Sequence, residues 1–390
     1  KTPTRRYRTR VAATSVPAVS EGRGGTAVRA AVCHGPGAAL LVEDLTLADP
    51  GPDEVRVAIE ACGICHSDLT YVDGGWAVDY PVVLGHEAAG RVTEVGGKAQ
   101  GPVVGEKVVV SLIRSCGQCR ACRRGHDVAC TGRMHLHDHS PLTDPAGNPV
   151  TQGLYTGAFA DAVVVHRSQC VPVPEDLPST SAALLGCGVL TGVGAVTNTA
   201  RVDAGEAVVV VGCGGVGLAA VQGARIAGAD PIVAVDPLPN KRDAALRFGA
   251  THAVDADDDV TEAVRAATGG QLADHVLVTT PAPAAMAGAL DLAAPMGTLI
   301  LVGIPDDGVT TEFDTGLLAV RNQSILGSKM GTSRPAVDVP LLVEHWRAGR
   351  LDLDGMVTSV HPLEGIAGAV AEMRSGAAIR TVVCPGGTER

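Results

Sequence analysis

The stretch from residue 208 to 217, Val-Val-Val-Val-Gly-Cys-Gly-Gly-Val-Gly, constrains the fold of this 390-residue chain more than any other feature. Four valines predict a buried strand, and the glycines follow in the spacing G-x-G-x-x-G before an apolar helical stretch. Gly212 permits the tight turn, Gly214 lets the backbone approach a pyrophosphate, and Gly217 lets the helix pack against the strand. Gly215 and Val216 open that helix, whose free N–H groups attract phosphate. The stretch predicts a dinucleotide site, the alternative being a structural turn in an unrelated sheet.

An acidic residue follows the glycine motif at the expected distance. Asp236 ends the next predicted strand, about 20 residues further on, where a carboxylate binds the adenosine ribose hydroxyls and repels a 2′-phosphate. The sequence therefore favours NAD over NADP. Lys241 and Arg242 follow closely, and their positive charges would weaken this preference.

The rest of the chain divides around this α/β unit. Residues 190–331 alternate strands and helices and form the predicted NAD-binding domain. Residues 27–189 read as short strands separated by Gly/Pro turns, and residues 332–390 end in a strand expected to return to that first domain. Residues 1–26 are basic and without apolar periodicity, which predicts a disordered tail.

Composition excludes several classes of partner. The net charge of −11 argues against nucleic acid, and no apolar run approaches the roughly 20 residues that span a bilayer. With only 2% aromatic residues, the core must consist mainly of Ala, Val and Leu, as in buried parallel sheets.

Four cysteines stand close together in the spacing C-x2-C-x2-C-x7-C. Four thiolates within fifteen residues suit a closed tetrahedral zinc site, which would be structural because no position is left for substrate. An iron–sulfur cluster is the rival, since ferredoxin spacings are similar. The second metal constellation favours zinc. The cysteines are Cys116, Cys119, Cys122 and Cys130.

That second constellation is dispersed along the sequence. Cys65 lies in Gly-Ile-Cys-His-Ser-Asp, His86 in Gly-His-Glu, and Cys187 in Leu-Gly-Cys-Gly. Their spacing does not prove that they meet, because an isolated cysteine is usually a small buried apolar residue. On the residues alone, the trio is a hypothesis.

Taken in order, these segments resemble a zinc-containing medium-chain alcohol dehydrogenase over nearly all of residues 30–385. Residues 184–199 look most similar to the class III, thiol-dependent formaldehyde dehydrogenase branch. The resemblance implies an α/β fold, with a GroES-like, mostly β catalytic domain and a Rossmann coenzyme domain. It also implies that Cys65, His86 and Cys187 bind a catalytic zinc, leaving the fourth position to water or substrate.

Further roles are implied by the same resemblance. Asp68 would orient the zinc-bound imidazole, and Glu87 would lie behind the metal. Ser67 would begin the proton relay. Some members of the family have a histidine three residues after this hydroxyl, where this chain has Thr70, so water or the cofactor ribose would complete the path. His66 would touch the pyrophosphate.

Cofactor and substrate contacts are implied in the same way. Trp76 and Leu112 resemble walls of the substrate pocket. Arg380 would contact phosphate, Lys241 the adenosine ribose, and Thr191 the nicotinamide. The residues expected along the nicotinamide side are Val302, Gly303 and Ile304.

The tract His135-x-His137-x-His139 lies among Asp138, Pro141 and Pro145, which predicts a solvated loop rather than a metal site. The favoured function is zinc-dependent hydride transfer between a small alcohol or aldehyde and NAD(H), in a cytoplasmic homodimer or, alternatively, a homotetramer. Two other functions stay open: a formaldehyde dehydrogenase that needs mycothiol or glutathione, and a non-catalytic protein that binds zinc and dinucleotide.

Overall fold

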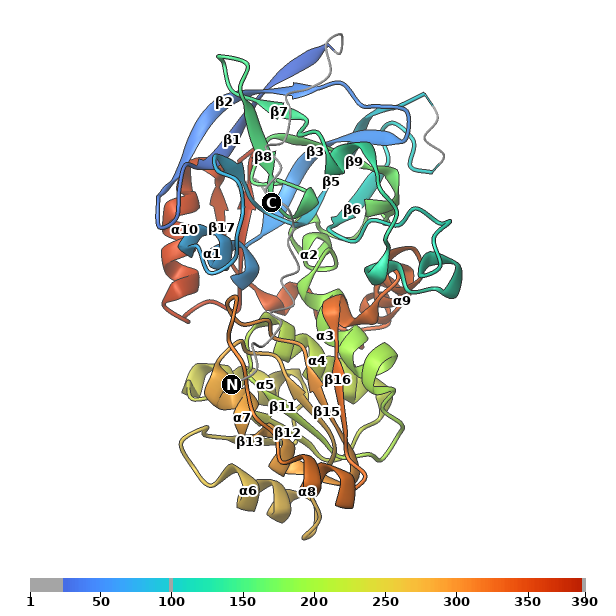
Figure 1. The fold of residues 1–390 in the computed structure, drawn as a ribbon, viewed down its shortest axis with the longest axis vertical. Coiled ribbons are helices and arrows are strands. Elements are labelled where there is room, and N and C mark those ends of the chain that lie inside the picture. Colours follow the sequence, from blue (N-terminus) through green and yellow to red (C-terminus); the bar gives the residue numbers. More distant parts are fainter. Residues whose placement is uncertain (1–23, 98–100, 388–390) are drawn as a thin grey trace, which may run out of the picture.

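The computed structural model describes residues 24–97 and 101–387, which fold into two bodies stacked along the long axis (Figure 1). One body is built on a mixed sheet and a small barrel, and the other on a parallel sheet with helices on both faces. Within these residues, no helix is both long and apolar enough to cross a membrane.

The coenzyme-type body holds a parallel sheet of six strands in the order β13-β12-β11-β14-β15-β16 within the described residues. This order reverses direction next to β11, which creates the crevice where dinucleotides bind in such sheets. The strands are β11 (Val208–Val211), β12 (Ile232–Val235), β13 (His252–Val254), β14 (Ala273–Val278), β15 (Ala293–Leu301) and β16 (Ser324–Gly327). The helices around them are α4 (Gly215–Ala227), α5 (Pro239–Phe248), α6 (Val260–Ala267), α7 (Pro283–Ala287) and α8 (Thr315–Val320).

Alternation along β11 explains why both faces of this sheet are covered. Val208 and Val210 join the core under α4 and α5, whereas Val209 and Val211 join a second core under α6 and α7. Successive side chains of a strand point to opposite faces, so a run of four valines needs apolar partners on each side.

The other body carries the segments with the predicted metal ligands. Its sheet runs β10-β6-β5-β3-β18-β17, β9 also pairs with β3, and a closed barrel has the order β1-β2-β7-β8-β4. The sheet strands are β3 (Glu54–Gly63), β5 (Glu87–Val95), β6 (Lys107–Ser111), β9 (Ala162–His166), β10 (Cys170–Pro172), β17 (Val357–Pro362) and β18 (Arg380–Cys384). The barrel strands are β1 (Gly25–Cys33), β2 (Leu40–Ala48), β4 (Val82–Val83), β7 (Leu142–Thr143) and β8 (Pro149–Gln152).

The end of the chain returns to this first body, where β18 pairs with β3 through Val382 opposite Gly63 and Val383 opposite Cys62. One continuous core joins the two bodies, because Ala61 and Val382 belong to the same cluster as Val208 and Leu277. The remaining helices are α1 (His66–Asp73), α2 (Ser179–Leu184), α3 (Gly188–Gly194), α9 (Pro335–Arg347) and α10 (Ile366–Arg374).

Two boundaries differ from the sequence-based expectation. Strand β1 begins at Gly25, two residues inside the segment 1–26 expected as a tail, and residues 1–23 of that segment lie outside the described residues. Helix α9 begins at Pro335 rather than at Val339. Proline fits the first helical position, because its missing N–H would have no partner there.

Candidate functional site

Three metal-ligating side chains meet where β3 ends and β5 begins. Cys65 caps α1, His86 directly precedes β5, and Cys187 caps α3. Their ligand atoms lie within 4.8 Å of one another, and all three residues are buried. The fold thus brings together the trio that the sequence left dispersed. Two thiols and one imidazole suit zinc with an open fourth position.

Asp68 fixes the orientation of His86. Its Oδ1 accepts hydrogen bonds from the His86 Nδ1 and from the Gly85 N–H, each at 3.0 Å, and its Oδ2 accepts the Cys65 N–H, also at 3.0 Å. A proton held on Nδ1 leaves Nε2 as the ligand atom. This buried Nε2 has no hydrogen-bond partner among the described residues. This imidazole nitrogen and the two buried thiols together form a set of ligands that zinc could bind.

Glu87 lies behind this trio and is fully buried. Neither carboxylate oxygen has a hydrogen-bond partner within the described residues, and the Arg380 Nη1 lies 3.5 Å from Oε2. Burial raises the pKa of Glu87 to about 7, although the positive charge of Arg380 opposes this shift. Arg380 is thus the positive charge that opposes the cost of burying this carboxylate.

Arg380 links the metal ligands to the glycine motif. A side chain at Gly215 would come within 2.0 Å of the Arg380 Nε, and one at Gly188 within 1.7 Å of Nη2, so only glycine at both positions admits the guanidinium. It donates to the Ile64 carbonyl at 3.4 Å, while Nε and Nη2 have no hydrogen-bond partner in the described part of the chain. These donors lie at the N-terminus of α4, where a pyrophosphate is expected.

The glycine motif has the geometry that the sequence predicted. Gly212 takes φ +92°, and a Cβ at Gly217 would lie 1.8 Å from the Gly212 carbonyl oxygen, so α4 packs directly on the turn. A Cβ at Gly214 would meet nothing within 4 Å, which leaves that face of the loop open. Gly215 and Val216 form the first turn of α4.

Asp236 follows β12 beside this loop. Its Oδ2 accepts the Cys213 N–H at 2.7 Å and its Oδ1 accepts the Leu238 N–H at 2.9 Å, which holds the carboxylate next to the motif. Arg242 does not contact the Asp236 carboxylate group in this arrangement. It donates to the main-chain carbonyl of Asp236 at 2.8 Å and forms an ion pair with Asp255 at 2.8 Å. Lys241 is buried and donates to the Ala378 carbonyl, and burial lowers the pKa of its ammonium group.

The residues expected near the nicotinamide lie between the two bodies. Val302 and Gly303 follow β15 and both donate to the Val278 carbonyl at 2.9 Å, and Ile304 is exposed. The Trp76 Nε1 donates to the Pro305 carbonyl at 3.0 Å, so this predicted pocket wall touches the same loop.

A methionine that the sequence did not single out lies beside the trio. The Met330 sulfur is 3.8 Å from the Cys187 Sγ and 3.5 Å from the Thr191 Oγ1. Met330, Gly331 and Thr332 all have positive φ, at 50°, 65° and 52°. Methionine and threonine rarely adopt this conformation, so no local pattern predicts the turn.

The residue expected to begin the proton relay, Ser67, and the one expected to touch the pyrophosphate, His66, lie in the first turn of α1. His66 is exposed and Ser67 is half-buried. The Thr70 hydroxyl donates to the His66 carbonyl at 3.1 Å, so the residue that replaces the family's histidine is engaged with its own helix.

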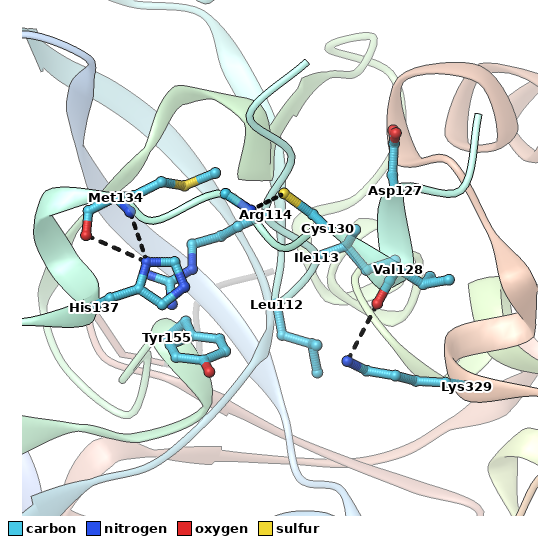
Figure 2. A pocket seen from close by; sticks show the side chains of 11 residues that line it. Leu112, Ile113, Arg114, Asp127, Val128, Cys130, Met134, His137, Tyr155 and Lys329 are labelled. Atoms are coloured by element: carbon cyan, nitrogen blue, oxygen red, sulfur yellow. Dashed lines mark hydrogen bonds between the residues drawn. The ribbon is translucent and has the colours of Figure 1, made fainter. Parts of the chain in front are cut away.

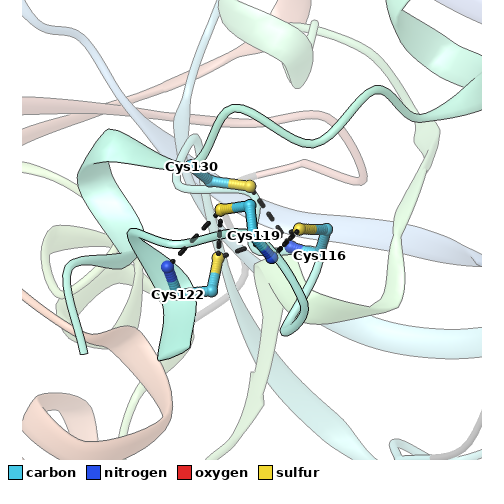
Figure 3. A group of neighbouring side chains, drawn as sticks. All are labelled: Cys116, Cys119, Cys122 and Cys130. Atoms are coloured by element: carbon cyan, nitrogen blue, oxygen red, sulfur yellow. Dashed lines mark hydrogen bonds between the residues drawn. The ribbon is translucent and has the colours of Figure 1, made fainter. Parts of the chain in front are cut away.

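The four clustered cysteines converge on one point in a lobe of short turns (Figure 3). All four sulfur atoms lie within 4.8 Å of one another. The Cys119 N–H donates to the Cys116 Sγ at 3.3 Å, and the Cys116 N–H donates to the Cys130 Sγ at 3.3 Å. Backbone donors such as the Cys122 N–H lower the pKa of Cys119 to about 5, which favours the thiolate that zinc requires. Burial acts in the opposite direction on Cys130 and raises its pKa to about 12.

The histidine tract is exposed at His135 and His137, as expected for a solvated loop, although some of its side chains contact one another. The rings of His135 and His139 stack with centroids 4.6 Å apart, and the His135 Nδ1 lies 3.3 Å from the Glu54 Oε1. His137 lines a cavity between the cysteine lobe and Lys329. Within the part of the chain that the structure describes, these histidines do not join a cluster that could hold a metal ion.

Comparison with known proteins agrees with this geometry. The alcohol dehydrogenase GroES-like domain family matches residues 51–175, and the zinc-binding dehydrogenase family matches residues 215–344. Alcohol dehydrogenase B of Mycobacterium tuberculosis is 37% identical over 354 residues, which cover 88% of this chain and 94% of that protein.

Two crystal structures have the same fold. An alcohol dehydrogenase zinc-binding domain protein from Burkholderia ambifaria has a TM-score of 0.88 and 36% identity, covering 93% of this chain and 99% of that one. The benzyl alcohol dehydrogenase from Acinetobacter calcoaceticus has a TM-score of 0.86 and 30% identity, covering 92% of this chain and 99% of that one.

The chain therefore belongs to the zinc-containing medium-chain alcohol dehydrogenase family, which confirms the expected family and fold class. It is an oxidoreductase of alcohols, with zinc and NAD(H) as its cofactors.

The two cysteine clusters predict separate metal sites, which zinc analysis of purified protein can resolve. We expect about two zinc ions per chain in the wild type and about one in Cys65→Ser, with hydride transfer lost. Cys170→Ser is the matched control, because Cys170 is a buried thiol outside both clusters. Unchanged zinc content and retained activity in Cys65→Ser would contradict the assignment of the trio.

Proposed function

We propose that Cys65, His86 and Cys187 hold the catalytic zinc of an NAD-dependent alcohol dehydrogenase, and that the four clustered cysteines hold a structural zinc. The observation that carries this proposal is the buried, orphaned Nε2 of His86 beside two buried thiols. When bound, zinc acts as a Lewis acid on the substrate oxygen and NAD accepts the hydride.

The chain's own residues would prepare this reaction. Asp68 holds the imidazole by the bond from His86 Nδ1, and it ties Cys65 to the same point through the Cys65 N–H. Arg380 keeps two unpaired donors beside the α4 N-terminus for the pyrophosphate, aided by His66 at the start of α1. The Ser67 hydroxyl takes the alcohol proton and passes it to solvent, because Thr70 donates to its own helix.

We also propose the division of the chain into a catalytic domain, 27–189 and 332–390, and a coenzyme domain, 190–331. A homodimer formed along the edge of the parallel sheet is supported by β16, which ends that sheet and is largely exposed. Nearby, Val320 is 81% exposed. The clustered thiols support a reducing compartment such as the cytoplasm, since metal-binding cysteines must stay reduced.

Turnover of simple alcohols tests the proposed activity. Zinc-loaded protein should reduce NAD with benzyl alcohol or a related apolar alcohol, and should oxidise NADH with the corresponding aldehyde. NADH absorbance measures both directions. Activity only with formaldehyde plus glutathione or mycothiol would instead support the thiol-dependent branch. Tight binding of zinc and NAD without any turnover would support a non-catalytic protein.

Asp236 should set the cofactor preference. Asp236→Asn removes the charge that repels a 2′-phosphate, so the ratio of kcat/KM with NAD to that with NADP should fall about tenfold or more. Asp243→Asn on the exposed side of α5 is the matched control and should leave the ratio unchanged. An unaltered ratio in Asp236→Asn would contradict the role of Asp236.

A further inference from the structure

A small cavity lies between the cysteine lobe and the turn at Lys329 (Figure 2). Its volume is about 100 Å³, and its lining includes Leu112, Arg114, Met134, Tyr155 and Lys329. None of these residues belongs to the trio of Cys65, His86 and Cys187.

Arg114 makes this cavity unusual. Arg114 is only 6% exposed, and its Nε, Nη1 and Nη2 atoms all lack a hydrogen-bond partner among the described residues. The guanidinium carbon lies 3.5 Å from the centre of the Tyr155 ring, so the positive charge is held over the face of this ring. A buried cation with its donors unused is costly unless an anion or other acceptors reach it.

Other donors and charges face the same space. Lys329 reaches in from the opposite side and makes a 3.4 Å hydrogen bond to the Val128 carbonyl. The His137 Nδ1 accepts the Met134 N–H at 2.9 Å, which leaves the ring proton on Nε2 as a donor. Two groups of the lining can carry negative charge: Asp127, whose carboxylate points away from the guanidinium in Figure 2, and the thiol of Cys130. Burial lowers the pKa of Arg114 to about 10, although Tyr155 and Cys130 oppose this shift. The cavity therefore holds two cations, Arg114 and Lys329, with the Cys130 thiol also in its lining.

Short stretches of chain link the lining of the cavity to the metal ligands. Lys329 directly precedes Met330, whose sulfur lies 3.8 Å from the Cys187 Sγ. On the other wall, Ser111 pairs with Glu87 across β5 and β6, and Arg114 follows Ser111 after three residues, at most about 10 Å of chain. A substrate whose reacting carbon lies at the trio could place its far end in this cavity.

We propose that the cavity is an anion subsite of the substrate pocket, in which Arg114, assisted by Lys329, binds a carboxylate carried by the alcohol or aldehyde. A planar guanidinium held over the face of the Tyr155 ring matches the two oxygens of a carboxylate and can bind both. This inference rests on the proposed function, and it narrows the substrate class to hydroxy acids or aldehyde acids with the anion remote from the reacting carbon.

A pair of substrates that differ only in charge tests this inference in the zinc-loaded enzyme. We expect kcat/KM for para-(hydroxymethyl)benzoate to exceed that for its neutral methyl ester by about tenfold or more in the wild type. Arg114→Met should lower this ratio by about 10- to 100-fold, mainly through KM, because a charged hydrogen bond to the substrate is lost. Arg114→Lys should restore part of the ratio.

Two further variants separate recognition from folding. Lys329 is exposed, so Lys329→Met should fold and should lower the ratio about threefold as a single screened charge is removed. Arg120→Met replaces an exposed arginine of the same lobe that does not line the cavity, and it should leave the ratio as in the wild type. Zinc content of each variant checks that the lobe is intact.

The outcomes distinguish this inference from the proposed function. Oxidation of benzyl alcohol without preference for the carboxylate, or an equal loss for both substrates in Arg114→Met, would overturn the anion subsite and leave the dehydrogenase standing. If no alcohol is oxidised, the proposed function fails. Calorimetry with para-(hydroxymethyl)benzoate then still tests the anion subsite. The wild type should bind this compound, and Arg114→Met should lose the binding.

Discussion

The carboxylate of Asp68 accepts three hydrogen bonds, and the geometry of the site depends on them. The donors are the Cys65 N–H, the Gly85 N–H and the His86 ring, each at 3.0 Å. They come from the start of α1 and from the turn before β5, so one buried side chain fixes two ligand-bearing segments at once. Hydrogen bonds to a buried carboxylate are among the stronger ones in a protein. Without them, the imidazole would have no fixed tautomer and the two segments no common anchor.

Arg380 extends this arrangement to the coenzyme-binding body. It lies in β18, which returns from the end of the chain to pair with β3, and its guanidinium fits between Gly188 and Gly215. The same residue lies 3.5 Å from Glu87. A single buried charge therefore contacts the metal side through Glu87 and the phosphate side through the α4 N-terminus. The continuous apolar core around Ala61, Val208 and Val382 holds the metal side and the phosphate side together.

Local patterns in the sequence predicted much of this molecule. The glycine turn and the cysteine lobe are short segments whose function depends on backbone geometry and spacing, which the residues themselves determine. The meeting of Cys65, His86 and Cys187 depends on the pairing of distant strands, so only the resemblance to a family implied it. Arg114 and Met330 could not be predicted, because their roles depend on a cavity between loops and on a left-handed turn at residues with no preference for it.

Two different cysteine-containing clusters should bind zinc, and the one oriented by Asp68 should be the catalytic centre. Anomalous diffraction from crystals of the zinc-loaded protein, recorded on both sides of the zinc absorption edge, tests this assignment most directly. We expect one peak among Cys65, His86 and Cys187 and a second among Cys116, Cys119, Cys122 and Cys130. A peak at the four-cysteine cluster alone, in protein that oxidises alcohols, would contradict this assignment.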